Sequence, residues 1–120
     1  MGSKSGVTRS VRSRATTARE SGTPKVNERQ FQKQVEHYLR LMGWLVFHPY
    51  LSIKSAPGYP DITAVRAGRV AFIELKTSDG RISANQALWG EALGAVGGTV
   101  EYHLIRGTDE GWQFIEQMFR

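Results

Sequence analysis

The segment PDITAVRAGRVAFIELK, residues 60–76, decides the fold of this chain. It contains two runs, 61–66 and 69–76, in which β-branched and aromatic residues are frequent, as they are in strands. Ala67-Gly68 separates the runs, and a link of two residues is the commonest connection in a β-hairpin. The segment therefore predicts two antiparallel strands joined by a two-residue turn.

The register of this hairpin brings charged side chains together at its open end. If residues 67–68 form the turn, Val65 faces Val70, and the same pairing places Asp61 opposite Glu74. Side chains that face each other point to the same side of a sheet, with β-carbons ~5 Å apart, and like charges there repel. Lys76 lies two positions after Glu74 and projects to the same side. We therefore expect two carboxylates and one ammonium group to converge.

These three side chains suit the hydrolysis of a phosphodiester bond. A divalent cation offsets the repulsion between Asp61 and Glu74, since Mg²⁺ binds through a few carboxylates and keeps several waters. It also polarises the phosphoryl oxygen and lowers the pKa of a bound water. The backbone carbonyl of Leu75 can complete its ligands, and Lys76 can orient the water or neutralise charge in the transition state. An edge ion pair without a metal explains the same pattern, because surface ion pairs are common.

Apolar periodicity and capping residues predict the remaining elements. Asn27, Ser83 and Thr108 are residues that favour the position just before a helix. The predicted helices are 27–42, 83–96 and 108–119, and the predicted strands are 44–47, 61–66, 69–76 and 99–105. The resulting order is α-β-β-β-α-β-α.

Composition limits the class of protein. The chain has 120 residues and no cysteine, which is enough for one domain and excludes disulfides, zinc ribbons and thiol catalysis. No apolar run approaches the length of a membrane span or follows the N-terminal charges as in a secretory signal. We therefore expect a cytoplasmic protein with no membrane partner.

The net charge of +5 is concentrated in residues 1–25, since residues 26–120 carry equal numbers of acidic and basic side chains. The first 25 residues are rich in Ser, Thr, Gly and Arg and lack apolar periodicity. We predict a disordered basic arm over 1–25 and a folded domain over 26–120. The arm either contacts nucleic acid phosphates or is a solvated leader without a partner.

Motifs around the hairpin resemble those of a known nuclease family. GYPD at 58–61, followed by FIELK at 72–76, is similar to the PD-(D/E)XK nuclease motif. ELKT at 74–77, followed by GRIS at 80–83 and then Gln86, resembles the VRR-NUC family in particular. The resemblance covers about residues 27–106.

This resemblance implies a restriction-endonuclease-like α/β core in which helices flank a central mixed β-sheet. It also implies a Mg²⁺- or Mn²⁺-dependent nuclease that acts on DNA, often branched or flapped. Stand-alone short members are similar to phage-encoded proteins, which places the expected activity in a bacterial or phage-infected host cell. Such members can dimerise to resolve four-way junctions.

The family places one more acidic residue on the first helix, and Glu28 and Glu36 are the two candidates. At 100° per residue, Glu28 lies about 40° from the centre of the apolar stripe, whereas Glu36 lies about 120° away on the polar side. We therefore expect Glu28 to face the sheet and join the catalytic group. A charge in the first turn of a helix also has an ordinary electrostatic role.

Gln86 has two predicted roles, since it matches a family residue near the active site and also completes a capping box with Ser83. Candidates for phosphate contacts are the basic residues near the motifs, although each is equally explained as a solvated surface charge. These candidates are Lys54, Arg66, Arg69 and Arg81.

The predicted function is a structure-selective DNA nuclease for branched, flap or four-way-junction DNA. One active site in a small chain motivates a homodimer, because a symmetric junction cut needs two copies. The alternative is a non-catalytic DNA-binding module on the same scaffold. A third possibility is a structural or assembly protein whose basic arm binds a partner.

Overall fold

The computed structural model describes residues 27–49 and 56–120. The predicted arm and Lys54 lie outside the described residues. The elements are α1 (Glu28–Leu41), β1 (Leu45–Phe47), β2 (Ile62–Arg66), β3 (Arg69–Lys76), α2 (Ala84–Gly94), β4 (Val100–Arg106) and α3 (Asp109–Phe119). The predicted order α-β-β-β-α-β-α is confirmed, and the ends of the elements differ from the prediction by at most two residues.

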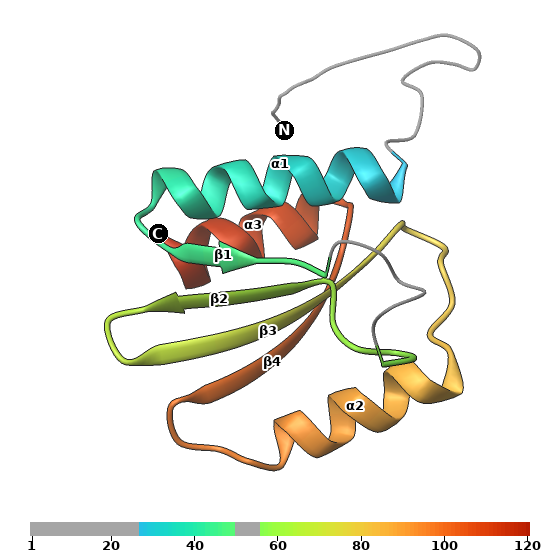
Figure 1. The fold of residues 1–120 in the computed structure, drawn as a ribbon. Helices are drawn as coiled ribbons and strands as arrows, with labels where there is room; N and C mark the ends of the chain where they lie inside the picture. Colours follow the sequence, from blue (N-terminus) through green and yellow to red (C-terminus); the bar gives the residue numbers. More distant parts are fainter. Residues whose placement is uncertain (1–26, 50–55) are drawn as a thin grey trace, which may run out of the picture.

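Four strands form one mixed sheet in the order β1-β2-β3-β4. The pairs β1–β2 and β2–β3 are antiparallel, and β3–β4 is parallel. α2 lies in the crossover connection that a parallel pair requires. α1 and α3 cover one face of the sheet, and α2 lies on the other face (Figure 1). The expected mixed sheet with flanking helices is therefore present.

The β2–β3 hairpin has the predicted register, with Val65 opposite Val70 and Ile62 opposite Ile73. Its turn residues Ala67 and Gly68 have φ values of 50° and 80°. Two successive positive φ values match the turn whose twist suits a two-residue hairpin. The turn thus sets the pairing that continues toward the open end of the hairpin.

The core lies between the sheet and the layer of α1 and α3. It contains Phe31, Val35, Leu39, Trp44, Ile62, Ala64, Ala71, Ile73, Leu75, Ile105, Ile115 and Phe119. Full burial of one large aliphatic or aromatic side chain contributes roughly 1.5–3 kcal/mol. Because five of these residues belong to β2 and β3, the core holds the hairpin in place and with it the charged residues at its open end.

On the opposite face of the sheet, the elements formed by residues 27–49 and 56–120 leave part of the surface uncovered. α2 packs against β4, and Gly90 is its buried residue. On β1 and β2, the residues Leu45, Phe47 and Val65 are 75%, 61% and 39% exposed.

Among the helices of residues 27–49 and 56–120, none combines the length and apolar content needed to cross a membrane.

Candidate active site

Asp61, Glu74 and Lys76 lie together at the open end of the hairpin. Asp61 directly precedes β2, and its Oδ2 accepts a hydrogen bond of 2.8 Å from the Leu75 backbone N–H. The carboxyl groups of Asp61 and Glu74 lie close enough for each to affect the pKa of the other. Lys76 Nζ lies 3.9 Å from Glu74 Oε2. The structure therefore brings these three side chains together, and their catalytic roles stay predictions.

Both carboxyl groups lie where their charged forms are disfavoured. The Glu74 side chain is 1% exposed, and burial together with the negative charge of Asp61 raises the pKa of Glu74 to about 8. Burial also raises the pKa of Asp61, while the Leu75 N–H, the Glu74 carboxyl group and the charge of Lys76 oppose this rise. Such a pair holds a proton between its members near neutral pH.

Glu28 is the acidic residue of α1 that lies at this end of the sheet. Asn27 caps α1 through a capping box with Gln30, which leaves Glu28 as the first residue of the helix. Burial raises the pKa of Glu28, the charge of Asp61 raises it further, and the charge of Lys76 lowers it. Glu28 therefore lies within electrostatic range of the carboxyl pair, as expected from the helix geometry.

Glu36 is directed elsewhere, and it is buried although it lies on the polar side of α1. It is 7% exposed. Its carboxylate accepts hydrogen bonds from Gln32 at 2.9 Å and Arg40 at 3.4 Å, and it lies 3.7 Å from His48 Nε2. The helix periodicity of α1 could not reveal this burial, because His48 comes from the segment after β1.

Gln86 both caps α2 and contacts Glu74. Its Oε1 accepts a bond of 2.9 Å from the Ser83 N–H, and its own backbone N–H donates to Ser83 Oγ at 3.1 Å. Its Nε2 donates to Glu74 Oε2 at 2.9 Å. Because the capping box engages the amide oxygen, the amide nitrogen is left facing the carboxylate. The predicted capping role is confirmed, and the contact with Glu74 is compatible with the second role.

Gly58 brings the loop before Asp61 against the start of α2. Its φ is +81°, and a β-carbon there would lie 2.6 Å from the Gln86 backbone nitrogen. The Trp89 indole N–H donates to the Pro57 carbonyl at 3.1 Å. The loop that leads to Asp61 is therefore fixed against the start of α2, whose Gln86 contacts Glu74.

The peptide groups of Leu75 point toward the side of Asp61. Val70 and Lys76 form backbone hydrogen bonds with the β4 side of β3. Since successive residues of a strand direct their N–H and C=O groups to opposite sides, those of Leu75 point to the β2 side. Its N–H meets Asp61 there, so its carbonyl lies on the same side as the carboxyl pair.

The donor set fits a hard divalent cation better than zinc. Within residues 27–49 and 56–120, no group of three or more His, Cys, Asp or Glu side chains could hold a metal ion. The candidate ligands from the sequence are the carboxylates of Asp61 and Glu74 and the Leu75 carbonyl, and all three are oxygen donors. Mg²⁺ accepts such a set because it retains several water ligands.

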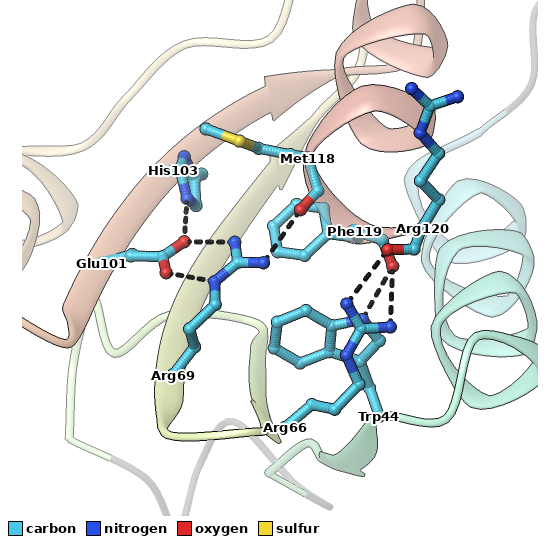
Figure 2. A network of polar contacts seen from close by, with 8 residues as sticks. All are labelled: Trp44, Arg66, Arg69, Glu101, His103, Met118, Phe119 and Arg120. Carbon is cyan, nitrogen blue, oxygen red and sulfur yellow. Dashed lines mark hydrogen bonds and ion pairs between the residues drawn. The ribbon is translucent and has the colours of Figure 1, made fainter.

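Arg66 and Arg69 lie at the other end of the hairpin, where they contact the end of α3 (Figure 2). Arg66 donates to the carbonyls of Met42 at 2.7 Å and Arg120 at 3.0 Å. Both guanidinium groups lie over the Trp44 ring, with 4.6 Å and 4.9 Å to its centroid.

Arg69 also forms a two-bond ion pair with Glu101, at 2.6 Å and 2.8 Å, and this pair lowers the pKa of Glu101 to about 2. These intramolecular acceptors favour a structural role for Arg66 and Arg69 over the predicted phosphate contact. Arg81, in contrast, is exposed just before α2.

Two residues near the site were not singled out from the sequence. Tyr102 lies on β4, opposite Phe72, and burial and the charges of Glu74 and Asp61 raise the pKa of Tyr102. Arg106 lies opposite Lys76. Only the parallel β3–β4 pairing brings these residues here, and no local pattern in the sequence specifies that pairing.

Comparison with known proteins identifies the fold. No family model matches the sequence, and no curated protein matches it. A solved structure titled "VRR_NUC domain" is 20% identical, with a TM-score of 0.63, and the match covers 77% of this chain and 97% of that one. Another, titled "VRR_NUC domain protein", is 17% identical, with a TM-score of 0.60, and the match covers 79% and 89%.

A weaker match is the Holliday junction resolvase Hjc of Archaeoglobus fulgidus, with 20% identity, a TM-score of 0.49, and coverage of 67% of this chain and 68% of that one. The two VRR_NUC structures superpose on most of this chain, with TM-scores of 0.63 and 0.60. The chain therefore has the restriction-endonuclease-like fold of the VRR_NUC domain structures.

Proposed function

We propose that this chain is a metal-dependent nuclease that hydrolyses phosphodiester bonds in DNA. The observation that carries the proposal is the buried Glu74 carboxyl group, which lies beside Asp61 at the open end of the hairpin with Lys76 Nζ 3.9 Å away. A purely structural ion pair accounts poorly for it, because one lysine faces three acidic groups when Glu28 is included. A buried carboxyl pair destabilises a fold when both members are charged, and such arrangements are concentrated at functional sites.

In this proposal each residue has a separate task. Asp61, Glu74 and the Leu75 carbonyl hold Mg²⁺ or Mn²⁺. A bound cation supplies a water of lowered pKa and polarises the phosphoryl oxygen. Lys76 orients the attacking water or neutralises the charge that develops on the phosphate. Glu28 accepts a hydrogen bond from a water at the site.

Gln86 holds the carboxylate of Glu74 in one orientation through its bond of 2.9 Å. It is a positioning residue in this scheme, because it reaches the reacting groups only through Glu74. The capping box with Ser83 restrains the amide, so little rotational freedom is lost when the site binds substrate.

The proposed substrates are branched, flap or four-way-junction DNA. Support for DNA as the partner comes from the six basic residues against one acidic residue in positions 1–25 and from the exposed Arg81. Such contacts release counterions, so each phosphate neutralised adds about 0.9 to the slope of log affinity against log salt on duplex DNA. We expect removal of residues 1–25 to weaken binding and to flatten this slope.

A second copy of the chain is the proposed partner for the exposed apolar face of Leu45, Phe47 and Val65. Exposed apolar side chains that cluster on one face favour association, and β1 is an edge strand of the sheet. Two copies would place two active sites on a symmetric junction. Light scattering with and without DNA tests this, and we expect Phe47→Lys to give a monomer. A monomeric wild-type mass in both conditions would contradict the dimer.

Cleavage of end-labelled single-stranded, duplex, flap and four-way-junction DNA tests the proposed function. We expect cuts that need Mg²⁺ or Mn²⁺, disappear with a chelator and are absent in Lys76→Ala. Lys33→Ala is the matched control, since Lys33 is exposed on α1. Tight, salt-sensitive binding without cleavage of any substrate would instead indicate a non-catalytic DNA-binding module.

A further inference from the structure

The turn of residues 77–80 follows β3, and Arg106 at the end of β4 donates hydrogen bonds to it. Lys76 and Arg106 are opposite each other in the parallel ladder, and the Gly107 N–H donates to the Lys76 carbonyl at 2.9 Å. Arg106 Nη1 donates to the carbonyl of Thr77 at 3.0 Å and to that of Gly80 at 2.7 Å. One guanidinium nitrogen therefore joins the two ends of the turn.

The turn is folded against the Lys76 side chain. A β-carbon added at Gly80 would lie 3.3 Å from Lys76 Cδ and 3.0 Å from Thr77 Oγ1. The Lys76 side chain is only 11% exposed. Since a free lysine side chain populates many rotamers and loses entropy when it is held in one, packing along its stem favours the conformation seen here.

We propose that Arg106 is a positioning residue for Lys76. By closing the turn of residues 77–80, it holds Gly80 against the lysine stem and directs Nζ toward the carboxyl pair. The planar guanidinium suits this task because it presents several donors in a fixed geometry. This inference rests on the proposed catalytic role of Lys76.

The same contact also restrains the start of α2. The chain passes from Gly80 to Ser83, which caps α2, and then to Gln86, which binds Glu74. Loss of Arg106 would therefore loosen both sides of the carboxyl pair, although Arg106 itself is directed at backbone carbonyls. Its effect on the reaction should be on the rate of the chemical step more than on DNA binding.

Steady-state kinetics of Arg106→Met test this, with Arg40→Met as the matched control. Both variants remove one positive charge, and Arg40 pairs with Glu36 on the far part of α1. A displacement of about 1 Å can reduce a rate about 10²-fold. We expect a fall of that order in kcat for Arg106→Met, with KM nearly unchanged, and wild-type kinetics for Arg40→Met. A kcat equal to that of the wild type in Arg106→Met would overturn the inference.

Gly80→Ala probes the same contact without removing the arginine. The new methyl group would press on the Lys76 stem, so we expect kcat to fall at unchanged KM. Gly94→Ala is its control, because a β-carbon at Gly94 meets no atom within 4 Å. Equal kcat values in these two variants would contradict the proposed contact.

Acetylation of lysines, followed by peptide mass spectrometry, gives a readout that needs no nuclease activity. We expect Lys76 to react more slowly than the exposed Lys33 in the wild-type protein, and to react faster in Arg106→Met while Lys33 is unchanged. An unchanged Lys76 rate would overturn the positioning role even if the wild-type chain cleaves DNA. A changed rate in a chain that cleaves nothing would instead reject only the proposed nuclease function.

Discussion

Glu74→Gln should stabilise the metal-free protein at high pH while abolishing cleavage. The amide keeps the size of the side chain, can accept the Gln86 bond and can donate to Asp61, but it cannot ionise. In the folded wild type, the pKa of Glu74 is raised from 4.5 to about 8. The protonated form therefore stabilises the fold fully below pH 4.5, and this contribution is lost as pH rises through about 8.

The size of the effect follows from linkage. One pKa unit corresponds to about 1.4 kcal/mol, so between pH 5 and pH 8 the wild type should lose at most about 4 kcal/mol that the variant keeps. Urea unfolding in a chelator, followed by tryptophan fluorescence, measures this difference at both pH values. Glu91→Gln, an exposed change on α2, is the control. A stability difference between Glu74→Gln and wild type that does not grow with pH would refute the reasoning.

Magnesium should narrow the difference in stability between the wild type and Glu74→Gln at pH 8. A ligand at one hundred times its dissociation constant stabilises the fold by about 2.7 kcal/mol. We expect Mg²⁺ to stabilise the wild type at pH 8 and to stabilise Glu74→Gln much less, because one carboxylate ligand is missing. Equal stabilisation of both proteins by Mg²⁺ would contradict the proposal that Glu74 is a metal ligand.

Three further predictions concern the same site. Mg²⁺ binding at pH 7 should release nearly one proton from Asp61 and Glu74, because the pKa of Glu74 is about 8. The binding enthalpy measured by calorimetry should therefore depend on the ionisation enthalpy of the buffer. A binding enthalpy that is the same in all buffers would contradict this prediction. Gln86→Ala and Ser83→Ala should each lower the free energy of unfolding by about 1 kcal/mol through loss of the cap. Only Gln86→Ala should also lower kcat strongly, because it removes the hydrogen bond to Glu74. Equal kcat values in the two variants would argue against the positioning role of Gln86. Gly58→Ala should lower both Tm and kcat, since its β-carbon would collide with the backbone of α2, and Gly94→Ala should lower neither.

Local patterns were sufficient to predict the hairpin and the helix ends. The Ala67-Gly68 turn determines which residues face each other on β2 and β3, and this register brings Asp61 and Glu74 together without any knowledge of the remaining chain. Asn27, Ser83 and Thr108 all cap helices as predicted, because capping depends on residues only three positions apart.

The parts that could not be predicted depend on contacts between distant segments. Arg106 meets the turn after β3 only because β4 pairs in parallel with β3. The burial of Glu36 depends on His48, and the acceptors of Arg66 lie at the end of α1 and after α3. A sequence pattern records that these residues are charged, but it does not record which backbone carbonyl or carboxylate will be beside them.

The most direct test of the central claim is Mg²⁺-dependent DNA cleavage by the wild type and by Asp61→Ala, Glu74→Ala and Lys76→Ala. Circular dichroism and thermal unfolding would first confirm that each variant is folded. We predict that the wild type cleaves and that all three variants lose cleavage while keeping the fold. Cleavage retained in all three folded variants would contradict the assignment of the active site to the open end of the β2–β3 hairpin.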